Sequence, residues 1–421
     1  MFISRPTRSL PFIPLLILQV YWLGLSFMWN SLHVIILPAV LLTMVPDNLK
    51  NTYLGLLTFV GLLVAMVVQP VSGAVSDRWI SRFGRRRPLI ALGTAFDFLF
   101  LAFLAWAGGL GWLAFGYIGL QLSSNVAHGS MQGLMPDKVP ENQLGFASGW
   151  KNFMDMTGLV LASLVMGSVY PPDTLHPVLP VGLIAAVMAF CALVTVLGVR
   201  EKSSALGKRL WSYRSFRQEF QIDWKANRSF AWLVASRLFF LTAIYGIQVF
   251  AQYYVRDVLA VANPIKLTGD LLAAITLALI TFALVGGWLS DRIGQKRVLY
   301  LASFISGVGC FLMLWARSPA TLLVFGGVLG VGIGMFITTN WALANVLAPT
   351  EESGKFLGLT NLATAGAGAI GRLEGPFIDL LNNARPGAWL GYSALFISGA
   401  FLIIISAVLL AKVKILDKVN Q

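Results

Sequence analysis

The chain has little charge for its length. Of its 421 residues, 12% are Asp, Glu, Lys or Arg, whereas 57% are hydrophobic. A soluble globular domain carries about twice that fraction of charged residues, so the composition excludes an ordinary soluble protein. We therefore expect an integral membrane protein that is built from long apolar helices.

Cysteine and histidine are scarce as well. The two cysteines, Cys191 and Cys310, both lie in apolar runs, and the chain has three histidines. Disulfide bonds and a Cys/His metal site are therefore not expected. The sequence also has no Ser-His-Asp order, no carboxylate pair and no Gly-rich phosphate loop. It predicts neither an enzyme nor a bound cofactor.

The few charges are mostly positive, and the formal net charge is +13. In a soluble protein this surplus would indicate nucleic acid or an acidic partner. In a membrane protein, Lys and Arg gather in the cytoplasmic loops. We therefore expect the lipid bilayer as the surroundings of the chain, and we expect no nucleic acid.

Twelve apolar runs are long enough to cross a hydrocarbon core about 30 Å thick. The even-numbered connections and both ends of the chain carry the basic residues, which predicts that both termini are cytoplasmic. The polar segment 200–230 separates six runs from six. We expect an all-α fold with an N-terminal bundle over 1–199, a cytoplasmic linker over 200–230 and a C-terminal bundle over 231–421. The runs are 13–43, 53–75, 89–108, 111–135, 146–169, 180–199, 231–255, 269–289, 297–315, 319–347, 356–378 and 387–412.

A charged turn occurs twice, after the second run and again after the eighth. Each copy has a Gly four residues before an Asp-Arg pair, with a Gly and basic residues behind it. Arginine clusters cannot lie in hydrocarbon, so both copies must connect membrane helices, and their recurrence indicates two halves built alike. The residues are Gly73, Asp77, Arg78, Gly84, Arg85, Arg86, Gly287, Asp291, Arg292, Gly294, Lys296 and Arg297.

We interpret the two turns as a reversible latch. Their carboxylates can cap helix N-termini or pair with arginine, at about 1 kcal/mol each when partly exposed. Contacts of that strength can be broken and formed again easily. The alternative is that the basic residues only orient the protein in the membrane, but orientation does not account for the repeated Gly, Ser and Asp.

Six runs plus six, the doubled turn and the long central loop together resemble the major facilitator superfamily of transporters. Within that superfamily, the stretch from Gln69-Pro70 to Pro88, together with Trp29 and Pro38, is similar to the branch of glycoside and sucrose-proton symporters and their animal relatives. The resemblance implies twelve transmembrane helices in two pseudo-symmetric six-helix bundles. It also implies a monomer in the plasma (inner) membrane that moves a small solute by alternating access.

The fourth run departs from the symporter pattern. Asn125, Gly129 and Asp137 match the family, but Gln121 and Gln132 stand where sucrose symporters carry an Asp and an Arg that are thought to couple proton and sugar. An amide cannot take up and release a proton near neutral pH. Coupling to a proton, coupling to another cation and facilitated diffusion are therefore all open alternatives.

Polar side chains form a stripe on the fourth run. Residues 121, 125, 128 and 132 share one helix face, and because an amide in lipid is costly, the stripe should face protein or a water-filled cavity. Runs 1, 7 and 10 carry similar faces; the alternative for each residue is a hydrogen bond between helices. The predicted solute-binding residues are Trp29, Asn30, His33, Gln121, Asn125, His128, Gln132, Tyr245, Gln248, Gln252, Asn340, Trp341 and Asn345.

Ionisable residues inside apolar runs are functional candidates by default. Asp97 is the first choice for a proton site, and its alternative is a structural partner for Lys151 or another polar group. Lys151 and Asp155 can pair with each other, and Arg237 can snorkel to the membrane surface. The coupling candidates are Asp97, Lys151, Asp155, Arg237, Arg372 and Glu374.

Amides and aromatic rings together suit a small uncharged solute, so we expect a secondary active transporter of a sugar or glycoside. One alternative is an exporter of amphipathic compounds, which would have a mainly apolar cavity. The other is a non-transporting member of the superfamily that serves as an assembly or pigment-delivery factor.

Overall fold

The structure, a computed structural model, describes residues 9–77, 79, 81–170, 176–201, 227–349 and 353–414. The regular structure in these ranges is helical. The chain divides into two compact units. Unit 1 comprises Met1–Asp47 and Leu57–Arg209, and unit 2 comprises Asn48–Leu56 and Leu210–Gln421.

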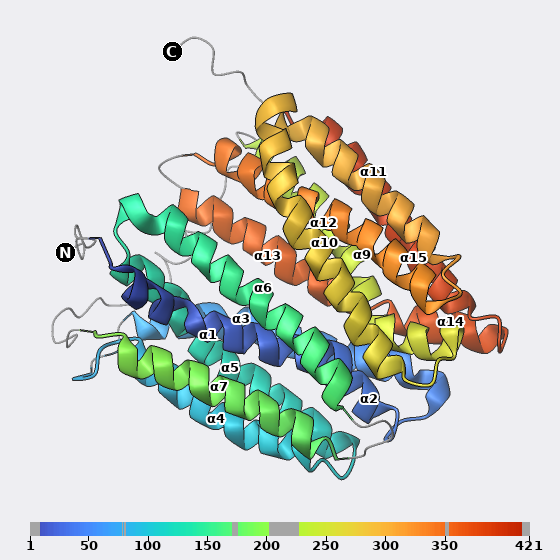
Figure 1. The fold of residues 1–421 in the computed structure, drawn as a ribbon, viewed down its shortest axis with the longest axis horizontal. Helices are drawn as coiled ribbons and strands as arrows, with labels where there is room; N and C mark the ends of the chain where they lie inside the picture. Colours follow the sequence, from blue (N-terminus) through green and yellow to red (C-terminus); the bar gives the residue numbers. More distant parts are fainter. Residues whose placement is uncertain are drawn as a thin grey trace. The chain divides into compact units, whose positions relative to one another are not determined.

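Unit 1 is a bundle in which α1 packs against α6 and α7, and α4 packs against α5 and α7. Helix α3 begins in unit 2 and continues in unit 1. The helices of this part of the chain (Figure 1) are α1 (Phe12–Asn30), a π-helical segment (Ser31–Ile36), α2 (Leu37–Leu41), α3 (Lys50–Ser76), α4 (Arg87–Ala105), α5 (Leu110–Lys138), α6 (Leu144–Val169) and α7 (Val178–Gly198).

Unit 2 repeats this arrangement, because α9 packs against α13 and α15, and α11 packs against α12 and α15. The equivalent helix pairs are thus α1/α6 and α9/α13, α1/α7 and α9/α15, α4/α5 and α11/α12, and α4/α7 and α11/α15. The helices are α9 (Arg228–Leu259), α10 (Pro264–Ile293), α11 (Gln295–Met313), α12 (Pro319–Leu347), α13 (Ser353–Arg372), α14 (Gly375–Ala384) and α15 (Leu390–Ala411).

The repeated pairing confirms the predicted all-α fold of two pseudo-symmetric six-helix bundles. In the described part of the chain, ten helical segments are long and apolar enough to cross a membrane. Helices α5 and α13 complete the set of twelve. Helix α5 is less apolar because it carries the predicted polar stripe.

Close helix contacts through glycine occur in equivalent helix pairs of the two units. A Cβ added at Gly129 of α5 would lie 2.3 Å from the Gln69 carbonyl oxygen of α3. A Cβ added at Gly330 of α12 would lie 2.3 Å from the Ile275 carbonyl oxygen of α10. Both helix pairs therefore need a residue without a side chain where their backbones meet.

Two of the predicted runs are interrupted. The first was expected to be one helix over 13–43, but it contains the π-helical segment Ser31–Ile36. Pro38 follows this segment; it lacks an N–H and clashes with the preceding turn, which favours the wider winding. The eleventh was expected over 356–378, but α13 ends at Arg372 and α14 starts at Gly375. Pro376 in the first turn of α14 cannot continue the hydrogen bonds of α13.

The two charged turns differ in length. The first lies between Ser76 and Arg87, as expected. The second was expected over 290–297, but Gly294 alone separates α10 from α11. Gly294 has φ +90° and Gly84 in the first turn has φ +99°, a conformation that side chains disfavour. A left-handed glycine therefore ends both turns, and in the second it reverses the chain by itself.

Both turns also share a hydrogen bond at the end of the preceding helix. Ser76 Oγ donates to the Gly73 carbonyl at 2.8 Å, and Ser290 Oγ donates to the Gly287 carbonyl at 2.7 Å. Arg78 of the first turn and residues 202–226 of the predicted linker lie outside the described residues.

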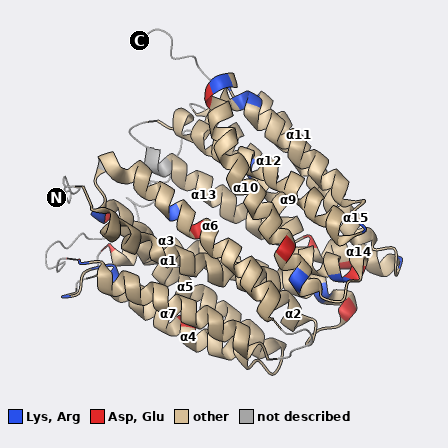
Figure 2. Ribbon diagram, viewed as in Figure 1, with Lys and Arg blue, Asp and Glu red and all other residues tan. Residues whose placement is uncertain are grey.

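Charged residues gather near the helix ends (Figure 2). One end of unit 2 is mainly basic, and the other mixes both signs. The basic end carries Arg292, Lys296, Arg297, Lys412 and Lys414, and the mixed end carries Lys50, Arg256, Asp257, Asp270 and Asp379. We expect the basic ends to face the cytoplasm.

We predict that Gly84→Ala lowers the free energy of unfolding by about 1–3 kcal/mol, the range for a strained backbone residue. The added Cβ would lie 2.3 Å from the Glu201 Cβ. Gly294→Ala is the matched control, because it has a similar φ and open space around its Cβ. Thermal unfolding in detergent, followed by tryptophan fluorescence, should show the larger loss for Gly84→Ala. Equal losses would mean that the contact with Glu201 has no effect on stability.

Candidate functional site

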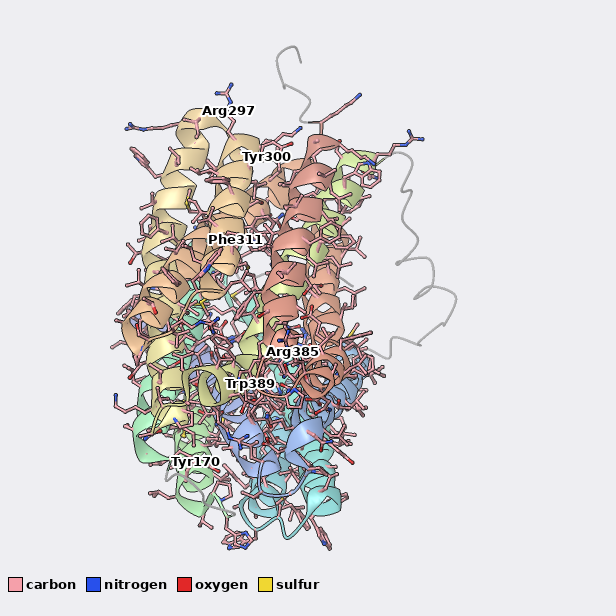
Figure 3. All side chains as sticks on the ribbon, turned by 90° about the vertical axis from the view of Figure 1, so that its right-hand side faces the viewer. Tyr170, Arg297, Tyr300, Phe311, Arg385 and Trp389 are labelled. Carbon is pink, nitrogen blue, oxygen red and sulfur yellow. The ribbon has the colours of Figure 1, made fainter. Side chains whose placement is uncertain are left out.

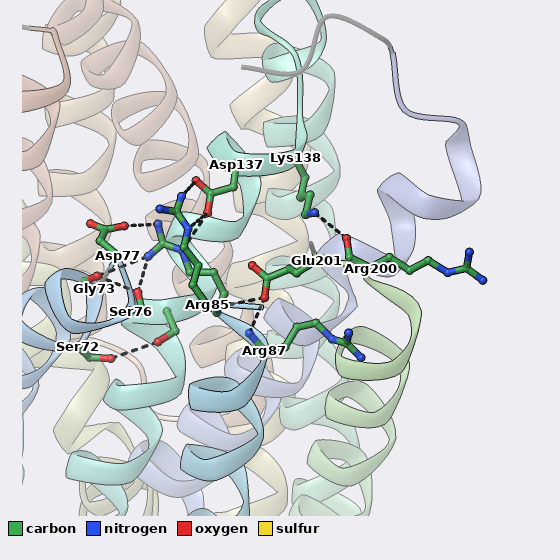
Figure 4. Close-up of polar contacts among 12 residues, drawn as sticks. Ser72, Gly73, Ser76, Asp77, Arg85, Arg87, Asp137, Lys138, Arg200 and Glu201 are labelled. Carbon is green, nitrogen blue, oxygen red and sulfur yellow. Dashed lines mark hydrogen bonds and ion pairs between the residues drawn. The ribbon is translucent and has the colours of Figure 1, made fainter. Parts of the chain in front are cut away.

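The first charged turn forms a network of ion pairs at one end of unit 1 (Figure 4). Arg86 contacts Asp77 through Nη2 and Ser76 through Nη1, and its Nε donates to Asp137 Oδ2 at 3.0 Å. Arg85 Nε donates to the same oxygen of Asp137 at 3.1 Å. Asp137 belongs to α5, so the network ties the ends of α3, α4 and α5 together.

Glu201, which follows α7, adds a fourth element to this network. Its Oε2 accepts hydrogen bonds from the backbone N–H groups of Arg86 at 3.0 Å and Arg87 at 2.9 Å. These donors lie at the start of α4, where backbone N–H groups have no partner within the helix. Glu201 therefore caps α4, and its charge is favourable at the positive end of the helix dipole.

The second charged turn makes different contacts. Asp291 is exposed and forms no ion pair with the residues that the structure describes. The Arg292 guanidinium lies 4.1 Å from the ring centroid of Trp288. Lys296 Nζ donates to the carbonyls of Ala411 at 3.1 Å and Val413 at 2.9 Å. The two turns are thus similar in sequence but differ in their contacts. The first forms a network of ion pairs, whereas Arg292 and Lys296 of the second make separate contacts.

A second cluster of unit 1 joins predicted solute-binding residues of α5 to the π-helical segment. The Tyr117 hydroxyl lies 2.9 Å from His33 Nε2 and accepts from Gln121 Nε2 at 2.7 Å. Asn125 Nδ2 donates to the Gln121 carbonyl at 2.7 Å and to its Oε1 at 3.2 Å. Trp29 stacks on His33 with 5.1 Å between ring centroids. We call these five residues the aromatic–amide cluster.

Charged groups lie on the neighbouring part of α6. Lys151 Nζ lies 4.0 Å from the Trp22 ring centroid, and the Trp22 and His128 rings are 5.0 Å apart. Lys151 and Asp155 could have paired with each other, but no ion pair joins them among the described contacts. Lys151 lies over the ring of Trp22 instead, which supplies a cation–π contact in its place.

Ser26 and Asn30 of α1 connect with this charged region. Helix α6 packs against α1 at Ser26, because a Cβ added at Gly158, three residues after Asp155, would lie 2.9 Å from the Ser26 Cβ. Asn30 Nδ2 donates to the Ser26 carbonyl at 2.9 Å and to its Oγ at 3.3 Å. The predicted residues of α1, α5 and α6 therefore meet in one region of unit 1.

Two predicted residues of unit 1 do not belong to this region. Gln132 is exposed, and its Nε2 lies 3.5 Å from His128 Nε2. Asp97 is fully buried and accepts a hydrogen bond from Ser123. Ser123 follows Gln121 by two residues, about 200° around α5, so Asp97 packs on the opposite side of that helix. Asp97 Oδ2 has no hydrogen-bond partner among the described residues.

In unit 2, Arg237 organises a separate cluster. Its Nε donates to Thr364 Oγ1 at 2.9 Å and its Nη1 donates to Asn340 Oδ1 at 3.0 Å. The guanidinium lies 5.6 Å from the Trp341 ring centroid. Arg237 was expected to snorkel, but it is 6% exposed. Its hydrogen bonds to α12 and α13 satisfy the guanidinium inside the bundle.

The other predicted residues of unit 2 are more scattered. Tyr245 and Gln248 of α9 are half-buried, and Gln252 is buried. Asn345 is exposed and donates to the Trp341 carbonyl of its own helix at 2.8 Å.

The two charged candidates at the end of α13 differ in their contacts. A Cβ added at Gly246 of α9 would lie 2.9 Å from Glu374 Oε2, so this carboxylate packs closely against α9. Arg372 donates to the Gly368 carbonyl at 2.7 Å. Within the described ranges, no three His, Cys, Asp or Glu side chains gather as metal ligands.

A buried polar network at the mixed end of unit 2 was not predicted. Lys50 Nζ lies 2.8 Å from Asp257 Oδ2, with both side chains under 5% exposed. The Tyr392 hydroxyl donates to the same oxygen at 2.7 Å. Asn51 Nδ2 donates to Asp379 Oδ1 at 2.7 Å, and the N–H of Thr52 donates to Asp379 Oδ2 at 2.6 Å. This network holds the start of α3 among α9, α14 and α15.

Only some of the missed residues left a signal in the sequence. Tyr117 lies four residues before Gln121, so it extends the polar stripe of α5 by one turn. Glu201 is an acidic residue within a basic segment. Lys50 and Asp257 lie next to the ends of predicted runs, and their burial depends on how the helices pack.

Comparison with known proteins gives a consistent family. The sequence profile of the Major Facilitator Superfamily matches residues 18–372 and 264–420. The multidrug resistance protein MdtG of Enterobacter lignolyticus (strain SCF1) is 25% identical over 85% of this chain and 81% of its own. MdtG of Serratia proteamaculans (strain 568) is 23% identical over 93% and 92%. The crystal structure of the nucleoside transporter NupG superposes with a TM-score of 0.73 at 13% identity, covering 96% of this chain and all of the other.

We predict that Asp137→Asn destabilises unit 1 more than Asp77→Asn does. Asp137 binds two arginines at 20% side-chain exposure, whereas the Asp77 side chain is 56% exposed. An exposed pair contributes about 0–1 kcal/mol, so Asp77→Asn should barely change the melting temperature. The check is thermal unfolding of both variants in detergent. A larger decrease of the melting temperature in Asp77→Asn than in Asp137→Asn would contradict this prediction.

We predict that Asp257→Asn lowers the free energy of unfolding by about 3–5 kcal/mol, because it leaves the buried Lys50 charge without its carboxylate. Adding Lys50→Met removes that charge and should recover most of the loss. A double-mutant cycle by thermal unfolding measures the coupling between the two positions. Additive losses would show that the ion pair is not the source of the effect.

Proposed function

Because this chain belongs to the Major Facilitator Superfamily, whose members transport solutes rather than catalyse reactions, we propose that it exports amphipathic aromatic compounds and that a proton gradient drives the export. The proposal includes alternating access by the halves 1–199 and 231–421, which the linker 200–230 connects. It also includes a monomer in the inner membrane with both termini in the cytoplasm.

This proposal rests on the side chains that form the aromatic–amide cluster of unit 1 and on the rings of Trp22 and His128 beside it. Five rings lie there, and the amides beside them are bonded to one another or to Tyr117. An amide whose hydrogen bonds are used within the protein offers little to a sugar hydroxyl, whereas ring faces still accept an apolar or cationic solute. The rings belong to Trp22, Trp29, His33, Tyr117 and His128. Trp22 and Tyr117 are buried, so the half-buried Trp29, His33 and His128 are the rings that would meet a solute.

The named relatives support the same class of solute. Two proteins called multidrug resistance proteins align with most of this chain. A pocket that recognises many compounds needs surface contact more than fixed hydrogen bonds, because fixed donors reject solutes that lack the matching group. The stacked Trp29 and His33 rings provide such a surface.

Asp155 is our choice for the proton-carrying carboxylate. Asp155 lies one turn before Gly158, where α6 packs against Ser26 of α1. Lys151, one helical turn before Asp155, lies over the Trp22 ring. Protonation of Asp155 would change the charge of this region by one unit. A cationic solute and a proton would then compete for the same negative charge, which is the requirement for exchange.

A sugar or glycoside is the second candidate, favoured by an amide that stays accessible. In unit 1, Gln132 is exposed. In this proposal its amide would bind a hydroxyl of the solute. The same transport assay can distinguish the two solutes.

The test is transport by proteoliposomes with an imposed pH gradient, using an aromatic cationic dye such as ethidium and a radiolabelled disaccharide. We expect dye movement that a protonophore stops, and no disaccharide movement. Asp155→Asn should abolish uphill movement of the dye, because an amide cannot exchange a proton. Asp97→Asn is the matched control and should keep the rate within about twofold, because Asp97 packs on the other side of α5.

Two results would overturn parts of this proposal. Disaccharide uptake without dye movement would favour the sugar candidate. Loss of coupling in Asp97→Asn with normal coupling in Asp155→Asn would exchange the roles of the two carboxylates. Equilibrium binding of the dye, followed by quenching of tryptophan fluorescence, separates a binding defect from a coupling defect in either variant.

A further inference from the structure

Helices α11 and α15 enclose an apolar groove on unit 2 of about 700 Å³. Bulky side chains in the groove are well exposed, among them Phe304 at 69% and Ile404 at 58%. The lining includes Tyr300, Ser303, Phe304, Gly307, Phe311 and Ile404. Nothing in the proposed transport mechanism uses this surface.

The groove has a charged mouth. Arg297, Tyr300, Phe304 and Phe311 are three, four and seven residues apart in turn, so they follow one face of α11. Figure 3 shows Arg297 at the end of the helix, Tyr300 next to it and Phe311 further along. Arg297 is exposed and makes no ion pair or hydrogen bond with the residues that the structure describes.

Two other basic groups near the mouth, Lys296 and Lys412, are engaged. Lys296 donates to the carbonyls at the end of α15, and Lys412 Nζ lies 4.2 Å from the Trp232 ring centroid. These contacts fix α11 and α15 at the mouth and leave Arg297 available. The mouth is positive, because no carboxylate among the described residues neutralises Arg297.

A polar group lies one turn inside the mouth. Ser303 is 3% exposed, and its Oγ has no hydrogen-bond partner among the described residues. A buried hydroxyl without a partner costs free energy unless a ligand or water binds it. From Tyr300 to Phe311 the helix rises about 16 Å, which matches half of a hydrocarbon core about 30 Å thick.

We propose that this groove binds one anionic phospholipid of the surrounding bilayer. The phosphate pairs with Arg297 and accepts from the Tyr300 hydroxyl, an ester carbonyl accepts from Ser303, and an acyl chain lies along Phe304 and Phe311. Charge at the mouth selects an anionic headgroup, because a basic side chain near the surface favours anionic lipid by about 1 kcal/mol.

A second groove of the structure serves as a comparison. It lies on unit 1, has about 500 Å³ and is lined by residues of α4, α5 and the segment between them, including Ala102 and Trp106. No basic side chain lines it. It therefore provides an apolar surface without the charged mouth.

The test is native mass spectrometry of the full chain, delipidated in detergent and given an equimolar mixture of phosphatidylglycerol and phosphatidylcholine. We expect one retained phosphatidylglycerol in preference to phosphatidylcholine. Arg297→Gln should weaken its binding about fivefold, the ratio that corresponds to one basic side chain. Gly307→Trp should remove it, because a Cβ at Gly307 meets only Ile403, at 3.9 Å, and the indole would fill the groove.

Ala102→Trp, which fills the groove of unit 1, is the matched control and should retain phosphatidylglycerol as the natural protein does. Equal retention of the two lipids by the natural protein would overturn the proposal, as would unchanged binding in Arg297→Gln. Arg297 is exposed, so that variant is informative even if Gly307→Trp does not fold. Lipid retention is measured without a transported solute, so this result is separate from any failure of the proposed transport function.

Discussion

The absence of water from the bilayer interior is the constraint on which the rest of this structure depends. Backbone N–H and C=O groups there must be bonded within the chain, and the described parts accordingly consist of long helices with short connections. Polar side chains obey the same requirement. Arg237 binds Asn340 and Thr364, and Gln121 binds Tyr117, so most of the polar groups inside the two units are members of bonded sets. The clusters for which we propose a function are therefore also the ones in which buried polar residues find hydrogen-bond partners.

This requirement separates what the sequence could predict from what it could not. The twelve runs, the two-fold repetition and the first charged turn follow from hydropathy and from the spacing of glycine and charge, which are local properties. The second turn was expected over eight residues but consists of Gly294 alone. The positive φ of this glycine lets α11 start directly after α10, and the sequence does not give that φ. The breaks at Pro38 and Pro376 could have been inferred from the missing N–H of proline. They were missed because both prolines lie within continuous apolar runs, which predict single helices.

Contacts between side chains of different helices were the hardest feature to predict. The polar stripe of α5 follows from its spacing. Asp97 was the first choice for a proton site, because the sequence does not say that Asp97 packs against Ser123, on the side of α5 away from Gln121. Lys50 and Asp257 are separated by about half of the chain, and their burial arises only when α3 and α9 pack in unit 2. A single sequence supplies periodicity within a helix and leaves the contacts between helices undetermined.

The difference between the two charged turns follows from their lengths. The longer first turn has room for Arg85 and Arg86 to fold back onto Asp77 and Asp137, so these four charges pair within unit 1. The one-residue second turn carries α10 directly into α11, and its basic residues point to α15 or outward instead. A duplicated sequence has thereby acquired two electrostatic environments. One is a closed network that joins four helical elements, and the other leaves a free positive charge at the mouth of an apolar groove, which is the combination that an anionic lipid requires.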